Sequence, residues 1–289
     1  MFIADSTQDY RILDTGDGMK LEAWGDIILA RPDPQVIWEK EKPWLWKNAD
    51  AVYTRSSKGG GAWEFKNKLP ESWKVTVGGL RFIVRPTGFK HTGLFPEQSA
   101  NWAFMQGLLK NRPGAKVLNL FAYTGGATLA CAEAGAQVVH VDAAKGMVQW
   151  AKENAEVSGL RECPTRWIVD DCLKFVLREQ RRGNRYDGIL MDPPSYGRGA
   201  DGQIWKMEDD VFHLIKETAK LLTDDPLFFM ISSYTTGLSD VVVRNMLQMT
   251  VAKQHGGEID SGSLVIPIKD SRIFLPCGNT ARWSKKTIQ

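Results

Sequence analysis

Residues Tyr186 to Gly199 read YDGILMDPPSYGRG, and this stretch decides how the chain is interpreted. Its apolar half, Tyr186 to Met191, is typical of a buried strand, and Asp192 stands where that strand should end. Pro193 and Pro194 have no N–H to donate, so they stop the hydrogen-bond ladder. Because ligands bind beyond the carboxyl ends of strands in open parallel sheets, we interpret this elbow as the reaction site.

Strands and helices alternate on both sides of the opening stretch. The apolar patterns predict strands over 116–121, 137–141, 165–169 and 227–232, and helices over 99–111, 125–135, 145–158, 173–181, 209–222 and 239–250. A loop is expected over 195–205, and two strand pieces, 263–267 and 272–275, follow without a helix. This rhythm indicates an α/β fold: a Rossmann-like, mostly parallel, doubly wound sheet that ends in an antiparallel hairpin.

The first 90 residues have a different pattern and indicate a small, mainly β domain. Short strands are expected over 10–35, 62–67, 73–77 and 80–86, whereas 36–61 is expected to be irregular, with a mobile loop over 56–61. We therefore expect two domains, residues 1–90 with a possible role in substrate binding and residues 91–289 with the reaction site.

Charge and aromatic residues are concentrated in one part of that small domain. The net charge of the chain is only +3, but residues 40–90 hold eleven Lys/Arg against four Asp/Glu, with tryptophans among them. Such a segment could grip RNA, with cations on phosphates and rings on bases. Alternatively, the tryptophans are core residues with solvated lysines around them, and the sequence leaves both interpretations open.

Composition limits the location of the protein. No segment reaches the ~18 uninterrupted apolar residues of a membrane span, and the opening residues MFIADSTQDYR lack the features of a signal peptide. The four cysteines show no CxxC spacing, which indicates reduced thiols and implies neither a metal site nor a disulfide. A cytoplasmic location is expected; the oligomeric state is not readable.

The segment LNLFAYTGGATLACAEAG, residues 118–135, forms a second candidate site. A strand here turns sharply through Thr124, Gly125 and Gly126 into a helix, so backbone N–H groups could meet a carboxylate or phosphate. The G-x-G-x-x-G dinucleotide fingerprint is absent. Glycines required only for tight packing are the alternative explanation.

Two acids stand at further strand ends. Asp142 could accept hydrogen bonds from a ribose diol, or it could cap the following helix. Asp171, preceded by Asp170 and followed by Cys172, could accept a hydrogen bond from an adenine amino group, or the two acids could cap the next helix. For Asp192 to Tyr196, the alternative to a substrate-binding elbow is a Pro-rich turn with a packed tyrosine.

Taken together, these motifs resemble the class I S-adenosylmethionine-dependent methyltransferases. More narrowly, 90–283 is similar to the ribosomal RNA large-subunit methyltransferases of the I and K types, including GLFPEQ at 93–98. The resemblance implies S-adenosylmethionine as cofactor, RNA (ribosomal RNA above all) as substrate, and no membrane partner. It implies that the 121–126 turn receives the methionine part, Asp142 the ribose and Asp171 the adenine. The complete implied cofactor set is Asn119, Phe121, Thr124, Gly125, Gly126, Asp142, Ala143, Asp171, Cys172 and Asp192.

For catalysis, the resemblance implies that Asp192, Pro193 and Tyr196 orient the acceptor beside the sulfonium. Family members that methylate C5 of cytosine need a thiolate after the fourth or fifth strand. Tyr196 and Tyr234 occupy those places here, so transfer without a cysteine nucleophile is expected. In amino-methylating members the aromatic follows the second proline directly, whereas Ser195 intervenes here. The rival interpretations are a non-catalytic RNA-binding protein on the same fold and a nicotinamide-dependent dehydrogenase.

Overall fold

The computed structural model describes residues 1–4, 9–56, 60–198, 204–235 and 237–285. The chain divides into two compact units. The larger unit comprises residues 1–2, 101–264 and 278–289, and the smaller comprises residues 3–100 and 265–277. The sequence predicted a domain boundary after residue 90, whereas the two units divide after Ala100. The segment 265–277 also belongs to the smaller unit.

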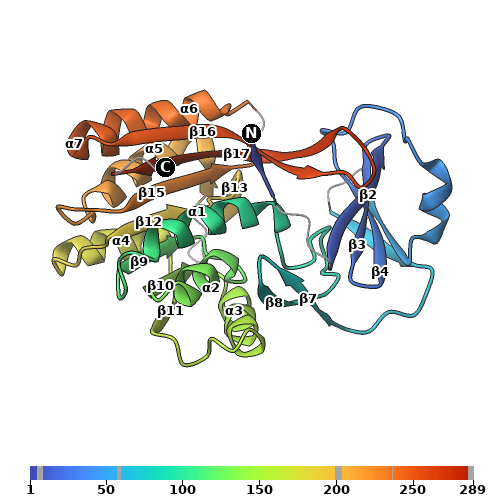
Figure 1. Ribbon diagram of the computed structural model, residues 1–289, viewed down its shortest axis with the longest axis horizontal. Coiled ribbons are helices and arrows are strands. Elements are labelled where there is room, and N and C mark those ends of the chain that lie inside the picture. The colour runs from blue at the N-terminus through green and yellow to red at the C-terminus, as the bar shows by residue number, and fades with distance from the viewer. Residues whose placement is uncertain (5–8, 57–59, 199–203, 236, 286–289) are drawn as a thin grey trace. The chain divides into compact units, whose positions relative to one another are not determined.

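One mostly parallel sheet of eight strands forms the framework of the larger unit (Figure 1). Its order is β1-β16-β17-β15-β12-β9-β10-β11. Neighbours among β9, β10, β11, β12 and β15 pair in parallel, and β17 pairs antiparallel with β15, which confirms the predicted fold class. The bounds are β1 (Phe2–Ile3), β9 (Lys116–Leu120), β10 (Gln137–Asp142), β11 (Thr165–Val169), β12 (Gly188–Met191), β15 (Phe228–Ser233), β16 (Glu258–Pro267) and β17 (Phe274–Ser284).

Helices cover both faces of this sheet. Leu118 and Val139 join the core that includes residues of α4 and α5, whereas Asn119 and His140, their neighbours along the strands, face Thr128 of α2. Successive strand residues point to opposite faces, so these two groups of helices lie on opposite sides. The bounds are α1 (Ser99–Leu109), α2 (Gly126–Glu133), α3 (Lys145–Val157), α4 (Cys172–Arg181), α5 (Met207–Ala219), α6 (Asp240–Leu247), a π-helical segment η3 (Gln248–Ala252) and α7 (Lys253–His255).

Burial on two faces explains why the central strands are apolar throughout. All four residues of β12 are buried, as expected for a strand in the middle of a parallel sheet. Adding a Cβ at Gly188 would place it 2.4 Å from the ring of Phe228 on β15, so glycine is needed where these strands meet. None of the helices in the described residues is long and apolar enough to cross a membrane.

The smaller unit is rich in strands. It contains a five-stranded sheet of order β2-β3-β4-β5-β6 and a separate β7-β8 pair. The bounds are β2 (Tyr10–Gly16), β3 (Met19–Trp24), β4 (Ile27–Pro32), β5 (Ala51–Arg55), β6 (Gly61–Phe65), β7 (Trp73–Val77) and β8 (Leu80–Val84), with short 3-10 helices η1 (Pro43–Asn48) and η2 (Pro96–Gln98). The mainly β character expected from the sequence is therefore present.

Two predicted irregular segments form strands instead. The segment expected to be irregular contains β5, which pairs in parallel with β4 and antiparallel with β6. The expected 195–205 loop contains β13 (Tyr196–Arg198) and β14 (Ile204–Lys206), paired antiparallel. Both pairings depend on partners elsewhere in the chain, which a local pattern does not reveal. Of the loop expected at 56–61, residues 57–59 lie outside the described residues, and Gly61 begins β6.

Candidate active site

Three strand ends meet at the carboxyl edge of the sheet in the larger unit. Leu120 is in register with Val141 on one side and with Met191 on the other. The next residues along these strands are Phe121, Asp142 and Asp192, so the side chains predicted to form the site follow a single register row. The register therefore brings together the three positions that the sequence assigned to methionine binding, ribose binding and acceptor positioning.

The turn after β9 has an unusual backbone. Phe121 and Tyr123 adopt left-handed conformations, with φ of 54° and 49°. Non-glycine residues are rarely found there, and such strain persists only where the surroundings impose it. Here the N–H of Phe121 donates to the thiol of Cys172 at 3.3 Å, and the N–H of Ala122 donates to the carbonyl of Val141 at 3.0 Å. The neighbouring strand and α4 thus fix the shape of the turn.

The two glycines after this turn are required by packing. Gly125 has φ of 89°, and a Cβ added there would lie 3.0 Å from the Cβ of Ala151 on α3. At Gly126, the first residue of α2, an added Cβ would lie 2.5 Å from the ring of Trp102. Close helix packing, the alternative explanation for these glycines, is therefore part of their role, and contact with a ligand remains a prediction.

Asp142 holds the same turn through both of its carboxylate oxygens. One oxygen accepts a hydrogen bond from the N–H of Tyr123 at 2.8 Å and the other from the N–H of Ala144 at 2.8 Å. Ala144, not Asp142, is the N-cap of α3, and no side chain caps that helix. Burial raises the pKa of Asp142 above its usual value. Each oxygen retains a further lone pair, so the carboxylate can still accept two hydroxyl donors.

Asp171 caps the helix that follows it, as the alternative to adenine binding proposed. It is the N-cap of α4, and its carboxylate accepts a hydrogen bond from the N–H of Lys174 at 2.9 Å. Asp170 accepts from the N–H of Asp171 and forms an ion pair with Arg178 on the same helix. Capping by Asp171 is thus observed, while its contact with adenine stays a prediction.

The thiol of Cys172 is buried directly beneath the turn. Its exposed fraction is 3%, and burial raises its pKa well above the usual value for a thiol. A protonated, buried thiol is a poor nucleophile, since the thiolate is the reactive form. Cys172 therefore supports the conformation of Phe121 by accepting its N–H, and covalent attack by this residue is disfavoured.

The elbow after β12 is tied to the turn by a residue that the sequence did not single out. The indole N–H of Trp205 donates to the carbonyl of Pro194 at 2.7 Å. Its ring lies 5.2 Å from the ring of Phe121, tilted by 51°. Tyr196 is 52% exposed on β13, and Pro193 is buried. Trp205 is opposite Gly197 across the β13-β14 pair. This pairing was not predicted, because the segment was expected to be a loop.

A second such contact joins the elbow to β15. The hydroxyl of Thr235 donates to the hydroxyl of Ser195 at 2.8 Å. Thr235 follows the end of β15, the strand that pairs with β12. The sequence contained a signal for it, since a polar segment that begins at Tyr234 follows an apolar strand, as Asp192 to Tyr196 does.

Asn119, Thr124 and Ala143 differ in how they are placed. The side chain of Asn119 is buried and donates to the hydroxyl of Thr128 at 2.9 Å, and Thr128 also contacts Nδ1 of His140 at 2.9 Å. Thr124 is buried, with its carbonyl accepting from Asn154, whereas Ala143 is exposed beside Asp142. Asn119 thus belongs to a buried polar chain beneath the turn, and the cofactor contacts proposed for these three residues stay predictions.

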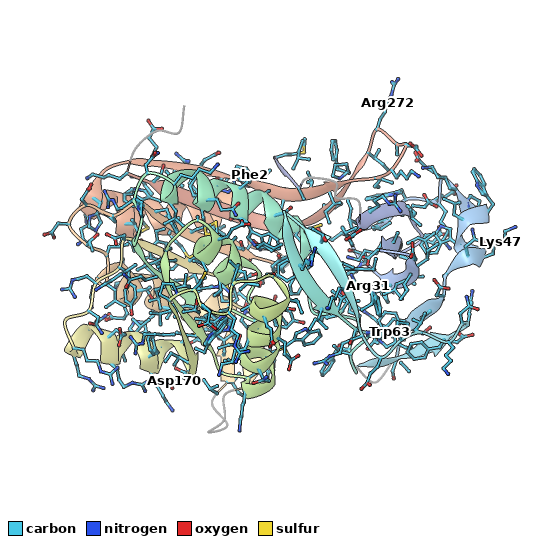
Figure 2. All side chains as sticks on the ribbon, turned by 60° about the horizontal axis from the view of Figure 1, so that its bottom comes forward. Phe2, Arg31, Lys47, Trp63, Asp170 and Arg272 are labelled. Atoms are coloured by element: carbon cyan, nitrogen blue, oxygen red, sulfur yellow. The ribbon has the colours of Figure 1, made fainter. Side chains whose placement is uncertain are left out.

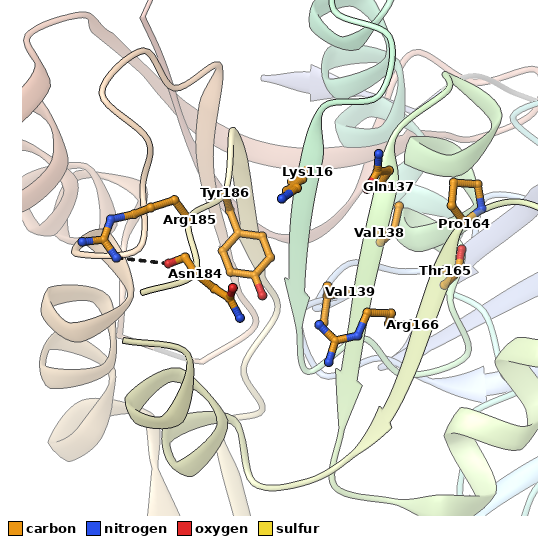
Figure 3. A pocket seen from close by; sticks show the side chains of 10 residues that line it. All are labelled: Lys116, Gln137, Val138, Val139, Pro164, Thr165, Arg166, Asn184, Arg185 and Tyr186. Carbon is orange, nitrogen blue, oxygen red and sulfur yellow. Dashed lines mark hydrogen bonds between the residues drawn. The ribbon is translucent and has the colours of Figure 1, made fainter. Parts of the chain in front are cut away.

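A pocket of 340 Å³ lies at the opposite end of the same strands (Figure 3). Lys116, Gln137 and Thr165, the first residues of β9, β10 and β11, line it together with Arg166 and Tyr186. The other lining residues are Val138, Val139, Pro164, Asn184 and Arg185. None of the predicted site residues lines this pocket, so the pocket and the strained turn are separate features.

The groups at the carboxyl edge fit S-adenosylmethionine. A ribose presents two hydroxyl donors, which match the two acceptor positions left on Asp142 by its bonds to Tyr123 and Ala144. A sulfonium carries positive charge, which a carboxylate such as Asp192 complements. The fixed turn at Phe121 also presents backbone beside the beginning of α2.

The same cofactor appears in the comparisons with known proteins. A family model described as S-adenosylmethionine-dependent methyltransferase matches residues 51–236. A crystal structure of a SAM-dependent methyltransferase from Agrobacterium tumefaciens is 37% identical, covers 99% of this chain and 93% of its own, and superimposes with a TM-score of 0.93.

Two curated relatives are ribosomal RNA large-subunit methyltransferases. The K enzyme of Neisseria meningitidis serogroup B is 28% identical over 83% of this chain and 70% of its own length. The K/L enzyme of Syntrophotalea carbinolica is 30% identical over 58% of this chain, which matches only 23% of that longer protein. The family model and the Agrobacterium structure agree with the geometry of the strand ends: this chain belongs to the S-adenosylmethionine-dependent methyltransferase family.

Proposed function

We propose that the chain methylates a base of ribosomal RNA at the carboxyl edge of the larger unit's sheet. The observation that carries this proposal is the register of Phe121, Asp142 and Asp192 beyond three neighbouring strands. The RNA part is supported by the likeness to ribosomal RNA large-subunit methyltransferases K and K/L. A cytoplasmic location belongs to the same proposal.

On the cofactor side, the proposed roles follow the hydrogen bonds already in place. Asp142 is held by Tyr123 and Ala144, so its remaining lone pairs are aimed without further reorganisation at a ribose diol. Phe121 and the start of α2 hold the methionine end, and Asp171 and Cys172 border the adenine. When bound, S-adenosylmethionine supplies an electrophilic methyl group.

On the acceptor side, most of the catalysis is positioning. Transfer from a sulfonium is an in-line displacement, and holding the two reacting atoms in line can supply a large part of the barrier reduction. Asp192 and the carbonyl of Pro193 orient the acceptor, and the exposed ring of Tyr196 stacks on it or limits its movement. A base in a structured region has to leave its stack to reach Asp192.

This transfer proceeds without a cysteine nucleophile. Ser195 and Tyr196 follow the prolines of the elbow, and Tyr234 and Thr235 follow β15. Cys172, beneath the turn, is kept protonated by burial. A base atom with its own lone pair, such as a ring or exocyclic nitrogen, suits these surroundings better than a carbon that needs covalent activation.

The proposal is tested by incubating the protein with S-adenosylmethionine labelled in its methyl group and separate fractions of total RNA and total protein. Label in the RNA fraction, traced by nucleoside analysis to one modified base of ribosomal RNA, is the expected result. Label confined to the protein fraction would contradict the proposed substrate. Cofactor binding with no label in either fraction would favour a non-catalytic RNA-binding protein.

A further inference from the structure

The smaller unit presents a face of aromatic and basic side chains on the β5-β6 hairpin. Across this hairpin, Arg55 is opposite Gly61, Tyr53 opposite Trp63 and Ala51 opposite Phe65. Residues two apart on a strand share a face, so Arg55, Trp63 and Phe65 point to the same side. Phe65 is 54% exposed, and β6 is the edge strand of its sheet.

A neighbouring turn is bonded to the same face. The indole N–H of Trp63 donates to the carbonyl of Thr87 at 2.9 Å and to that of Phe89 at 3.2 Å. Within the turn, the hydroxyl of Thr87 donates to the carbonyl of His91 at 2.9 Å. These bonds hold the backbone of Phe89, whose side chain is 68% exposed, beside the indole of Trp63, and Figure 2 labels Trp63. The two exposed phenylalanines therefore belong to a fixed surface.

The rings of this surface are arranged for contact with flat ligands. Trp63 and Phe65 have centroids 6.4 Å apart and planes within 27° of parallel. Tyr53, on the same face of the hairpin, is buried and meets Trp63 edge-on at 5.4 Å and 71°, so it packs against the indole. Exposed rings with fixed orientation lose little entropy on stacking with a base, and stacking of this kind tolerates any base sequence.

A buried network reaches this turn through Arg31, whose guanidinium donates to the carbonyl of Lys90 at 2.8 Å. Glu22 is fully buried and accepts from both the Nε and a terminal nitrogen of Arg31, at distances of 3.1 Å and 2.7 Å. Lys20 lies 3.3 Å from Glu22 and 3.4 Å from Asp33. The carboxylates of Glu22 and Asp33 are thus already engaged by Arg31 and Lys20.

Lys90 and Arg55 are the cations of the network that lack such a partner. Among the described residues, neither has a carboxylate within ion-pair distance, and the ammonium of Lys90 contacts only the carbonyl of Pro32, at 3.5 Å. Burial and the charge of Lys20 lower the pKa of Lys90 to about 8. A half-buried cation among other cations is stabilised when an anion approaches it.

We propose that this aromatic-basic face, formed by Arg55, Trp63, Phe65, Phe89 and Lys90, binds an unpaired segment of the RNA substrate. The inference rests on the proposed function. Bases stack on the exposed rings while phosphates approach Lys90 and Arg55. An unpaired strand fits better than a duplex, since in a duplex the base faces are covered by their neighbours. The face would therefore hold a single-stranded part of the same RNA that is methylated.

The test measures binding of a fluorescein-labelled, single-stranded 12-nucleotide RNA to the full chain by anisotropy. The double variant Phe65→Ala/Phe89→Ala should bind at least tenfold more weakly than wild type, because each lost stacking contact weakens binding by about that factor or more. The matched control is Trp44→Ala, which removes another exposed ring (62% exposed) from η1 of the same unit and should leave binding unchanged.

A salt series tests the cationic part of the face. Lys90→Ala should make the slope of log K, the association constant for RNA, against log salt concentration less steep by about 0.7. This is the change expected for one lost phosphate contact to a single strand. Lys74→Ala, an exposed lysine on β7, is the control for charge alone. Equal affinity of wild type and the Phe65→Ala/Phe89→Ala variant for the RNA would overturn the inference. The exposed rings would then serve another partner, such as a protein.

The outcomes separate this inference from the proposed function. If wild type transfers methyl groups to RNA and the face variants bind RNA as wild type does, the inference alone is wrong. If the face variants weaken RNA binding but wild type transfers no methyl group to RNA, the proposed function alone is wrong. Cofactor affinity, measured by calorimetry on the same preparations, should be unchanged in every face variant.

Discussion

The two ends of the larger unit's parallel sheet differ in what they can do. At the amino end, the turns that need a left-handed residue use glycine, as at Gly114 and Gly135. At the carboxyl end, Phe121 and Tyr123 adopt that conformation despite its cost. Glycine would satisfy the backbone there at lower cost, so the side chains of this turn are retained for another reason.

The charges of the two ends differ as well. The amino-end pocket is lined by Lys116, Arg166 and Arg185, with no carboxylate among its lining residues. The carboxyl end presents Asp142 and Asp192 in one register row. A sulfonium is complemented by negative charge, which the carboxyl end offers and the lining of the amino-end pocket does not. A pocket of 340 Å³ therefore does not by itself locate a reaction site.

The largest expected effect comes from removing the carboxylate of Asp192, which we propose positions the acceptor. We expect Asp192→Ala to lower methyl transfer by at least about 100-fold, since loss of one positioned polar group in a transition state commonly has that effect. Affinity for S-adenosylmethionine should change by less than about tenfold. Single-turnover transfer to RNA, with calorimetry for the cofactor, measures both. Normal turnover in this variant would remove the distinction between the two ends.

A smaller effect is expected at the ribose position. Asp142→Ala should weaken cofactor binding by about 30-fold, because charged hydrogen bonds contribute about 1.5–3 kcal/mol. Asp142→Asn retains one acceptor oxygen, so its cofactor affinity should lie between that of Asp142→Ala and that of wild type. Since burial raises the pKa of Asp142, binding should also weaken on acidification at a higher pH than for an ordinary carboxyl. Calorimetric titration across pH measures this, and unchanged affinity in Asp142→Ala would assign the ribose elsewhere.

His140 provides a stability prediction for the polar chain beneath the turn. Burial, followed by the charge of Lys152, lowers its pKa to about 3 in the folded protein. A depressed pKa means that stability is present above the ordinary pKa of about 6.5 and is lost as pH falls from there towards 3. We expect about 2 kcal/mol of lost stability between pH 7 and pH 5 from this residue. Urea unfolding of His140→Gln should show a correspondingly flatter pH profile, and an unchanged profile would contradict the assignment.

Packing at the start of α2 can be separated from ligand binding. Gly126→Ala should destabilise the protein by about 1.5 kcal/mol, because its new Cβ must displace the ring of Trp102. Gly146→Ala, on the exposed side of α3 with no atom within 4 Å of the added Cβ, is the matched control and should be neutral or stabilising. Equal free energies of unfolding of the two variants in urea would contradict this prediction. They would show that α2 or Trp102 can shift to accommodate the new Cβ.

The smallest effect is expected at the amino end. Arg166→Ala alters the charge of the pocket but should change turnover and cofactor affinity by less than about twofold, because we propose that the reaction takes place at the other end of the sheet. The same assays as for Asp192→Ala measure it, which makes it the charge-altering control for that variant. A tenfold loss of activity would require a functional link between the two ends.

Much of the sheet could be predicted from sequence because its strands are continuous apolar runs that end at acids or glycines. The strand before Asp192 and the strand before Phe121 are of this kind. In contrast, β5 and the β13-β14 pair form only through distant partners, so their short and weakly patterned sequences were predicted as irregular segments.

The position of the candidate site residues in the sheet could be predicted for the same reason, while their contacts with cofactor and acceptor stay predictions. Strand ends identify Asp142 and Asp192, since parallel strands bring their carboxyl ends to one edge. The sequence did not reveal Trp205, which joins the elbow to the turn, or the left-handed backbone of Phe121. These features depend on contacts between residues far apart in the chain, and backbone strain has no local sequence signal when the residue is not glycine.

The central claim, that the cofactor binds at the carboxyl end of the sheet, is tested most directly by a crystal structure with S-adenosylhomocysteine. We predict ligand density beside the Phe121 turn, with the ribose hydroxyls within hydrogen-bond distance of Asp142 and the sulfur facing Asp192. Density in the pocket lined by Lys116 and Arg166, with the Phe121 turn left empty, would contradict the account.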